Sequence, residues 1–497
     1  MTVQDGSTLS STKWTILASV INGVLTIVIG AVLARLLSPA IYGLVAIAYI
    51  VISFAGYFVR LGVGTALVQK EDLNSEDINF AITFSMGIGF VSALVLALIA
   101  PLIAALFTKP ESNAVIAAMS LSLWFSSFSS TLIGLLRRNM LFKFLSIVSI
   151  AQTIFTGIFS ISMAWFGSGV WSLVWPLIIG QLIVLILFFM KVKSSFELNF
   201  QFSLSGYNHI LKFGSRYTFI SILEYFGSNL DTIFIGRFFS VSQLGLYDRA
   251  YKLAYLPSQT LITSITSVMF PVFSRLQTQM EKFKETQNKL FLFIGLLSTC
   301  IAIGMVPATR DVVLVLFGPQ WLDSVPILKI LLFAVPFDFM AASLGLTFDA
   351  TNKLKDKIKI QTIAVFSLLI GILFLYQYGP IGIALAITLC QLLRFLIYIF
   401  FNQKIFHLPK KILLRNSIQI LLAGTIVFFI SRFAVVQSTK LSFSPLPALS
   451  FDIILCLFVL LSFIILNTRT FLGVDSFQEG YSIVRTFLVN KGDKNGG

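Results

Sequence analysis

The sequence predicts an all-α polytopic membrane protein with about fourteen transmembrane helices. Its composition is 57% apolar and only 11% charged, and its mean hydropathy is +0.91. Apolar stretches long enough to cross the roughly 30 Å hydrocarbon core, which takes about 20 residues, recur along the 497 residues. These stretches do not alternate as the strands of about 10 residues in a transmembrane barrel would. Helical spans are therefore expected throughout.

The individual spans are the apolar runs between charged or turn-rich breaks. The first six are predicted near residues 13–37, 42–60, 78–107, 113–136, 144–166 and 170–190. A second six are predicted near residues 211–238, 246–270, 287–308, 325–349, 358–378 and 381–402. Two more are predicted near residues 412–434 and 447–467.

The order of these spans predicts two consecutive six-helix lobes followed by an accessory pair. We assign residues 1–190 to the first lobe and 211–402 to the second. The connection at 191–210 mixes aromatic with polar residues, which is typical of a segment lying along the cytoplasmic interface. The accessory helices fall within 403–470, and 471–497 is expected to be a cytoplasmic tail.

The basic residues predict the orientation. With the N-terminus in the cytoplasm, most of the 36 Lys and Arg residues fall in cytoplasmic connections, as the positive-inside rule requires. Both termini are then cytoplasmic, and the bias accounts for the net charge of +15. Because this charge is spread over many connections and forms no basic module, nucleic-acid binding is excluded.

A short internal repeat supports two lobes related by an axis along the membrane normal. Arg35-Leu-Leu-Ser38 followed by Gly43-Leu44 recurs as Arg237-Phe-Phe-Ser240 followed by Gly245-Leu246, at an offset of 202. The same offset relates Tyr49 to Tyr251. Two sets of six spans with the same topology predict a central cavity between the lobes.

Polar residues inside the spans are the candidate functional residues, because a charge at the bilayer centre costs at least about 2.5 kcal/mol. Glu224 and Asp231 share one face of the seventh span, and Asp338 lies beside a proline in the tenth. Their carboxylates are candidates for coupling to H⁺ or Na⁺. The alternative is a structural ion pair with a neighbouring helix.

Basic and aromatic residues supply a second set of candidates. Asp248 and Lys252 are spaced i, i+4 and are expected to pair on the eighth span. The cationic side chains available to hold a phosphate or an acidic sugar are Arg35, Arg237, Arg249, Lys252 and Arg394. Tyr49 continues a polar face of the second span, although small residues on such faces also serve helix packing.

No enzyme signature is present. The sequence has no phosphate-binding glycine loop with Lys and no metal-spaced His or Cys cluster. Cys300, Cys390 and Cys456 are expected to be packing residues. No cofactor or metal is therefore expected.

Four segments of the sequence are distinctive: RLLSPAIYGLVAIAYIVISFAGYFVRLGVGTALVQKEDLNSEDI from Arg35, LLRRNMLFK from Leu135, NLDTIFIGRFFSVSQLGLYDRAYKLAYLP from Asn229 and MFPVFSRLQ from Met269. They resemble the polysaccharide-transport family, the Wzx-type oligosaccharide flippases of the multidrug, oligosaccharidyl-lipid and polysaccharide exporter superfamily. The resemblance is distinctive over about the first 280 residues and weakens to hydropathy afterwards.

This resemblance implies a V-shaped pair of lobes that flip an undecaprenyl-diphosphate-linked oligosaccharide across the bacterial inner membrane by alternating access, driven by an ion gradient. Such a protein would serve surface polysaccharide biosynthesis, including lipopolysaccharide or exopolysaccharide, beside polymerases and glycosyltransferases. The cavity positions that it implies are Asp231, Arg237, Tyr247, Arg249 and Tyr251. Gating is as good an explanation as binding for Arg35 and Arg237.

Three alternatives stay open at this point. Two belong to the same superfamily: a multidrug or cation antiporter, and a flippase for the lipid-linked peptidoglycan precursor. The third is a non-transporting membrane subunit of a polysaccharide assembly complex.

Overall fold

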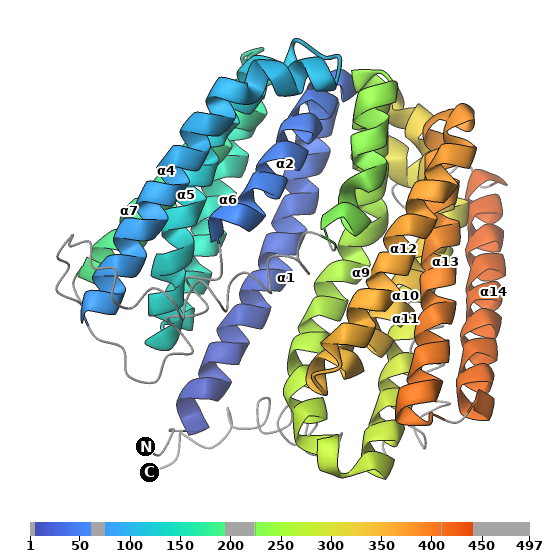
Figure 1. Cartoon of the computed structure of the whole chain (residues 1–497). Coiled ribbons are helices and arrows are strands. Elements are labelled where there is room, and N and C mark those ends of the chain that lie inside the picture. The colour runs from blue at the N-terminus through green and yellow to red at the C-terminus, as the bar shows by residue number, and fades with distance from the viewer. Residues whose placement is uncertain (1–4, 61–74, 194–222, 224, 409, 441–497) are drawn as a thin grey trace, which may run out of the picture. The chain divides into compact units, whose positions relative to one another are not determined.

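The computed structural model describes residues 5–60, 75–193, 223, 225–408 and 410–440, and within these ranges the chain is helical without a strand (Figure 1). The all-α prediction is confirmed. Ten stretches of the described residues are long and apolar enough to cross a membrane, one of which, Leu354–Phe406, contains two helices.

The helices begin and end close to the predicted bounds. The first group is α1 (Asp5–Leu36), α2 (Pro39–Arg60), α4 (Ser75–Leu106), α5 (Ser112–Arg138), α6 (Phe142–Trp165) and α7 (Trp171–Lys193). The later group is α9 (Val241–Arg275), α10 (Met280–Leu316), α11 (Val325–Ala350), α12 (Leu354–Leu375), α13 (Gly379–Phe406) and α14 (Lys410–Lys440). Residues 225–238 form a further helix. The predicted linker, the span near 447–467 and the tail lie mostly or wholly outside the described residues, so the total of fourteen stays a prediction.

The chain divides into two compact units. Unit 1 contains Met1–Leu256, Leu316–Leu328 and Val365–Ile387, and unit 2 contains Pro257–Val315, Lys329–Ala364 and Thr388–Gly497. One boundary falls inside α9 at Pro257. A proline lacks the backbone N–H that would continue the helical ladder, which makes this a natural point for the division.

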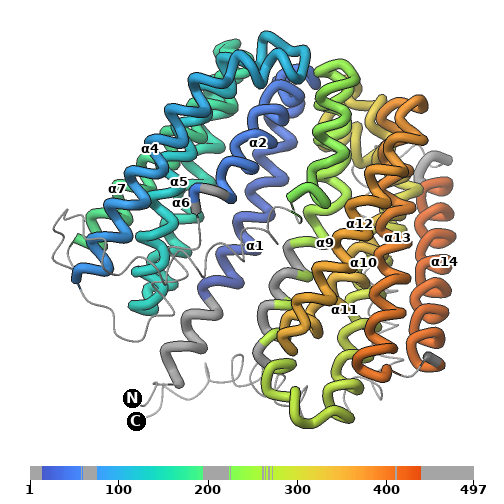
Figure 2. The backbone as a smooth tube through the Cα atoms, in the orientation of Figure 1, coloured from blue at the N-terminus to red at the C-terminus, as the bar shows by residue number. Residues whose placement is uncertain are grey.

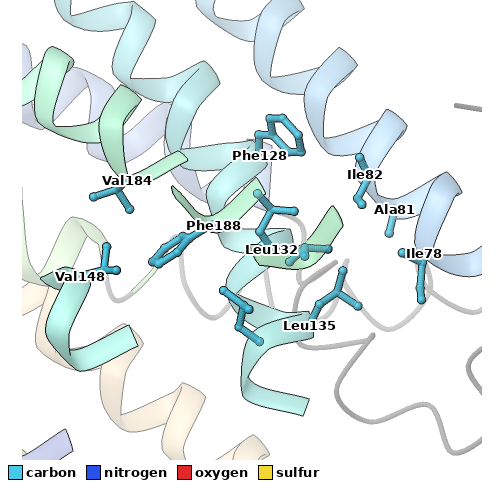
Figure 3. Close-up of a cluster of buried hydrophobic side chains, with 11 residues drawn as sticks. Ile78, Ala81, Ile82, Phe128, Leu132, Leu135, Val148, Val184 and Phe188 are labelled. Carbon is cyan, nitrogen blue, oxygen red and sulfur yellow. The ribbon is translucent and has the colours of Figure 1, made fainter. Parts of the chain in front are cut away.

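Helix α5 organises the first bundle of unit 1, where it packs against α4, α7 and α2. Figure 3 shows the apolar cluster at this packing, in which Leu132 and Leu135 are fully buried. They lie among Ile82 of α4, Val148 of α6 and Phe188 of α7. Four helices thus share one core.

Small and hydroxylated residues let α4 and α5 approach closely. The Ser85 and Thr131 hydroxyl oxygens are 2.5 Å apart, and Ser127 donates to the Ser85 carbonyl at 2.8 Å. A Cβ on Gly89 would lie 2.7 Å from the Ser127 Cβ. Because hydrocarbon surrounds membrane helices, such close packing and interhelical hydrogen bonds replace much of the hydrophobic driving force.

The polar face of the first span takes part in packing. Asn22 Nδ2 of α1 donates to the Ser149 hydroxyl of α6 at 2.9 Å. The hydroxyls of Ser19 and Thr26 donate hydrogen bonds to backbone carbonyls one turn earlier in their own helix. These polar residues of α1 therefore make contacts within the helix and with α6.

The apolar cluster gives a stability prediction. Leu132→Ala should lower the free energy of unfolding by about 2 kcal/mol, the low end of the range for buried Leu→Ala changes. Thermal unfolding in detergent measures it. The matched control is Leu98→Ala on α4, whose side chain is 71% exposed. Equal losses in the two variants would contradict the assigned core.

Unit 2 has a core of its own around α10, α11, α13 and α14. Asn402 of α13 lies within hydrogen-bond distance of the Thr347 hydroxyl, and Ser431 of α14 donates to the Gly304 carbonyl of α10. Cys300 and Cys390 are buried, as expected of packing residues, whereas Cys456 lies outside the described residues. Figure 2 follows α12 and α13 as consecutive antiparallel helices.

Candidate substrate-binding site

The first turns of α2 and α9 meet through two glycines. A Cβ on Gly245 would lie 1.8 Å from the carbonyl oxygen of Pro39, and a Cβ on Gly43 would lie 1.9 Å from that of Val241. Pro39 and Val241 begin the two helices, and they are related by the same offset of 202 as the glycines. We call these four residues the glycine contact. The sequence repeat is thus a pair of reciprocal surfaces that only glycine allows to meet.

Arg249 lies just beyond the glycine contact. Its guanidinium carbon is 3.9 Å from the centre of the Tyr42 ring, and Gly30 of α1 is its neighbour on another side. A cation over an aromatic face is stabilised by the ring quadrupole, and more so away from water. The Arg249 Nε makes no hydrogen bond within the described residues and lies 3.5 Å from an Asp248 oxygen.

A second cation lies one helical turn further along α9. Lys252 Nζ is 2.8 Å from an Asp248 carboxylate oxygen, which confirms the predicted i, i+4 pair, and 5.8 Å from the centre of the Tyr49 ring. The Lys252 side chain is 46% exposed, whereas that of Asp248 is 13% exposed. We call Tyr42, Tyr49, Asp248, Arg249 and Lys252 the cationic cluster.

The charges of the cluster do not balance. Arg249 and Lys252 share one carboxylate, Asp248, so this group carries an excess positive charge on helices of a membrane protein. An anion with several oxygens, such as a phosphate, would supply the missing charge and accept hydrogen bonds from guanidinium and ammonium groups. The cluster therefore has the chemistry of a phosphate-binding site.

The short helical segment Pro319–Ser324, which was not predicted to be part of a site, contacts the end of α1. Gln320 Nε2 and Trp321 Nε1 both donate to the carbonyl oxygen of Ala34, at 2.6 and 2.8 Å. Trp321 is fully buried and meets Tyr42 edge to face, with ring centres 5.4 Å apart. This segment fixes the ring on which Arg249 lies. An amphipathic Trp and a turn-forming Gly-Pro before it were the only signals in the sequence.

The 225–238 helix contributes a carboxylate that contacts α9. Asp231 is buried and accepts a 2.5 Å hydrogen bond from the Tyr247 hydroxyl. The Tyr247 ring stacks with Tyr251, and Tyr251 stacks with Tyr255 at 4.5 Å. Three of the expected positions, Asp231, Tyr247 and Tyr251, are therefore brought together in one network.

Arg394 and Asp338 form a separate site within unit 2, where an Arg394 Nη2 group and an Asp338 carboxylate oxygen make an ion pair. This is the structural pairing that the sequence left as an alternative for interior carboxylates. Gln391, one turn before Arg394, has a buried side-chain oxygen without a hydrogen-bond partner among the described residues.

The other expected positions are not part of the cationic cluster. Arg35 and Arg237 are both exposed, at the ends of helices that lead to the glycine contact. The guanidinium carbon of Arg237 lies 5.8 Å from the centre of the Phe238 ring. Glu224 lies outside the described residues.

Comparison with known proteins decides the family. The sequence profile of a family described as "Polysaccharide biosynthesis protein" matches residues 32–326, which is more than half of the chain. The chain belongs to this family. The matched region contains both repeats, the glycine contact and the cationic cluster.

Among curated relatives, the lipopolysaccharide biosynthesis protein WzxC of Escherichia coli K12 is 24% identical over 392 residues, which cover 78% of this chain and 79% of WzxC. The succinoglycan biosynthesis transport protein ExoT of Rhizobium meliloti is 25% identical and covers 66% of each chain. The teichuronic acid biosynthesis protein TuaB of Bacillus subtilis is 24% identical, over 65% of this chain and 67% of its own.

Solved structures give the fold. The lipid II flippase MurJ in an inward closed conformation matches with a TM-score of 0.73 at 18% identity, covering 91% of this chain and 98% of MurJ. The Vibrio cholerae MATE transporter VcmN matches with a TM-score of 0.54 at 15% identity, covering 82% of this chain and 98% of VcmN. The family protein thus has the fold of the transporter superfamily that its sequence resembles.

Proposed function

We propose that this family member is a flippase that moves a lipid-linked oligosaccharide across the bacterial inner membrane for surface polysaccharide biosynthesis. The observation that carries the proposal is the cationic cluster: two cations, Arg249 and the half-exposed Lys252, share the one carboxylate of Asp248 in a membrane protein. A diphosphate linking sugar to lipid has the charge that this cluster lacks. The roles of WzxC and ExoT in polysaccharide biosynthesis support the same substrate class.

Alternating access would use the glycine contact as its outer seal. The bias of basic residues puts the turn between α1 and α2, and hence this contact, on the side opposite the cytoplasm. With the first turns of α2 and α9 joined, substrate would reach the cluster from the cytoplasmic side. Separation of Gly43 from Val241 and of Gly245 from Pro39 would then open the outer side. The two six-helix lobes proposed from the repeat would be the moving parts.

Asp231 is the proposed coupling carboxylate, with Glu224 and Asp338 as further candidates. Asp231 is buried and tied to α9 through Tyr247, so binding of H⁺ or Na⁺ at its carboxylate would change the contact between two helices. Coupling requires such a difference in ion affinity between the two states. The cluster and the coupling carboxylate then act on the same helix.

This assignment makes Asp231→Asn a test of coupling. Substrate movement in proteoliposomes should lose its stimulation by an imposed H⁺ or Na⁺ gradient, because the amide neither titrates nor supplies a carboxylate. Tyr247→Phe keeps the carboxylate but removes the hydrogen bond that ties it to α9, so it should weaken the stimulation without abolishing it. The double variant Asp231→Asn/Glu224→Gln is measured as well. Full gradient dependence in the single and the double variant would show that neither carboxylate couples.

The proposed function is tested by reconstitution. Purified protein in vesicles should expose a fluorescent undecaprenyl-diphosphate oligosaccharide to a membrane-impermeant quencher faster than protein-free vesicles do. No acceleration by correctly folded protein would reject it, and export of a cationic dye instead would favour the antiporter. No acceleration with intact binding to polymerase or glycosyltransferase partners would favour the assembly subunit.

A further inference from the structure

An apolar groove lies between α2, α4 and the 225–238 helix in unit 1. Its volume is about 560 Å³, within the range of about 300 to 1,000 Å³ that ligand sites show. The walls are formed by residues such as Ile50, Phe54, Val95, Ile103 and Phe226. No lining residue carries a charge.

The groove has little polar surface to hold water. Its polar lining residues are Ser92 and Tyr225, and the Tyr225 hydroxyl donates to the Ile50 carbonyl at 2.8 Å. A buried water needs two to four polar partners. Hydrocarbon is therefore the occupant that the lining fits.

The groove is long as well as apolar. Its lining runs from Val91 of α4 to Phe107, the residue directly after this helix, which is about 24 Å at about 1.5 Å per residue. One leaflet is only about 15 Å of the roughly 30 Å hydrocarbon core. A phospholipid acyl chain stays within one leaflet, so a groove of this length favours a longer chain.

The groove and the cationic cluster are next to each other along α2. On α2, Tyr49 faces Lys252 of the cluster, and the next residue, Ile50, lines the groove. Rings of Phe54, Tyr225 and Phe226, with centres 5.2 to 5.9 Å apart, line the groove. A site of positive charge and an apolar groove thus lie within adjacent turns of one helix.

We propose that this groove binds the long polyprenyl chain of the lipid-linked substrate while the cationic cluster holds its diphosphate. The inference rests on the proposed function, which it deepens by giving the lipid part of the substrate a site of its own. It makes chain length, together with head-group charge, a determinant of what the protein binds.

Filling the groove tests this assignment. Ser92→Trp places a large ring among the lining residues, and Leu98→Trp puts the same ring at an exposed position of the same helix. The probes are undecaprenyl diphosphate and geranyl diphosphate, which share a head but differ in chain length. Binding to full-length protein in nanodiscs is measured for each.

We expect Ser92→Trp to weaken undecaprenyl diphosphate binding by about tenfold, or about 1.4 kcal/mol, and to leave geranyl diphosphate binding unchanged. Leu98→Trp should change neither. Equal affinities of Ser92→Trp and the unaltered protein for undecaprenyl diphosphate would overturn the proposal, as would an equal loss for both probes. Ala55→Phe, from the opposite wall, repeats the test if Ser92→Trp is poorly folded.

A photoreactive amino acid at Val95 identifies the occupant in native membranes. Crosslinks to polyprenyl lipid support the assignment, whereas crosslinks to phospholipid acyl chains alone contradict it. Binding of undecaprenyl diphosphate in the groove without transport of its oligosaccharide form would reject the proposed function and leave this site standing.

Discussion

Gly245→Val should hold the outer side of the protein open and abolish transport. A Cβ at residue 245 would lie 1.8 Å from the Pro39 carbonyl oxygen, a backbone atom that no side-chain rotation can move away. The first turns of α2 and α9 must then separate. Because interfaces of this kind have discrete arrangements, we expect a shift of the equilibrium toward the open state rather than a small adjustment.

The measurement is the labelling rate of a cysteine at Leu37, which is 3% exposed beside the contact, in a protein whose three native cysteines are replaced. A membrane-impermeant maleimide should label Gly245→Val about 10 to 100 times faster than the parent, a shift of about 1.4 to 2.8 kcal/mol. Gly43→Ala, the reciprocal change, should act in the same direction. Gly87→Ala is the control, because no atom lies within 4 Å of a Cβ there.

Unchanged labelling in both glycine variants, with normal melting temperatures, would show that α2 and α9 do not seal the outer side. Fast labelling together with normal transport would show that the glycine contact is not needed for transport.

Arg249→Gln should reduce transport of a lipid-linked oligosaccharide by about 10 to 100 times. A hydrogen bond to a charged group contributes about 1.5 to 3 kcal/mol, and Arg249 is the more buried of the two cations in the cluster. Lys252→Gln should have a smaller effect, because the Lys252 side chain is 46% exposed and an exposed charge contributes about 1 kcal/mol or less to an ionic contact. Initial rates in proteoliposomes give both values.

Tyr42→Phe is the matched control for Arg249→Gln. It keeps the ring on which the guanidinium lies and removes only the hydroxyl, so transport should stay near the parent rate. A loss in Tyr42→Phe as large as that in Arg249→Gln would indicate a packing role for this pair. Arg237→Gln, at an exposed position, tests the gating interpretation of that residue separately.

The helices could be predicted well from the sequence because an apolar run of sufficient length identifies each span. It also predicted the Asp248–Lys252 pair, since both partners lie on one helix at a fixed spacing. The repeat around Gly43 and Gly245 was visible in the sequence, but the contact between its two copies could not be predicted from it. Only the three-dimensional arrangement shows that each glycine faces the first residue of the other helix.

Contacts between distant segments could not be predicted from local patterns. Gln320 and Trp321 donate to a carbonyl 286 and 287 residues earlier in the chain, and nothing in their own segment indicates this partner. Arg394 and Asp338 were each recognised as interior residues, but their pairing depends on how α11 packs against α13. The apolar groove was hidden because its lining has the composition of any lipid-facing surface.

The most direct test of the account is a structure of the protein with undecaprenyl diphosphate bound. We predict the diphosphate at the cationic cluster, with phosphate oxygens about 2.7 to 2.9 Å from Arg249 and Lys252 nitrogens. Arg249 should then have shifted from its position over Tyr42 toward the phosphate. A diphosphate bound elsewhere, with Arg249 still over Tyr42 and Lys252 still paired with Asp248, would contradict the central claim.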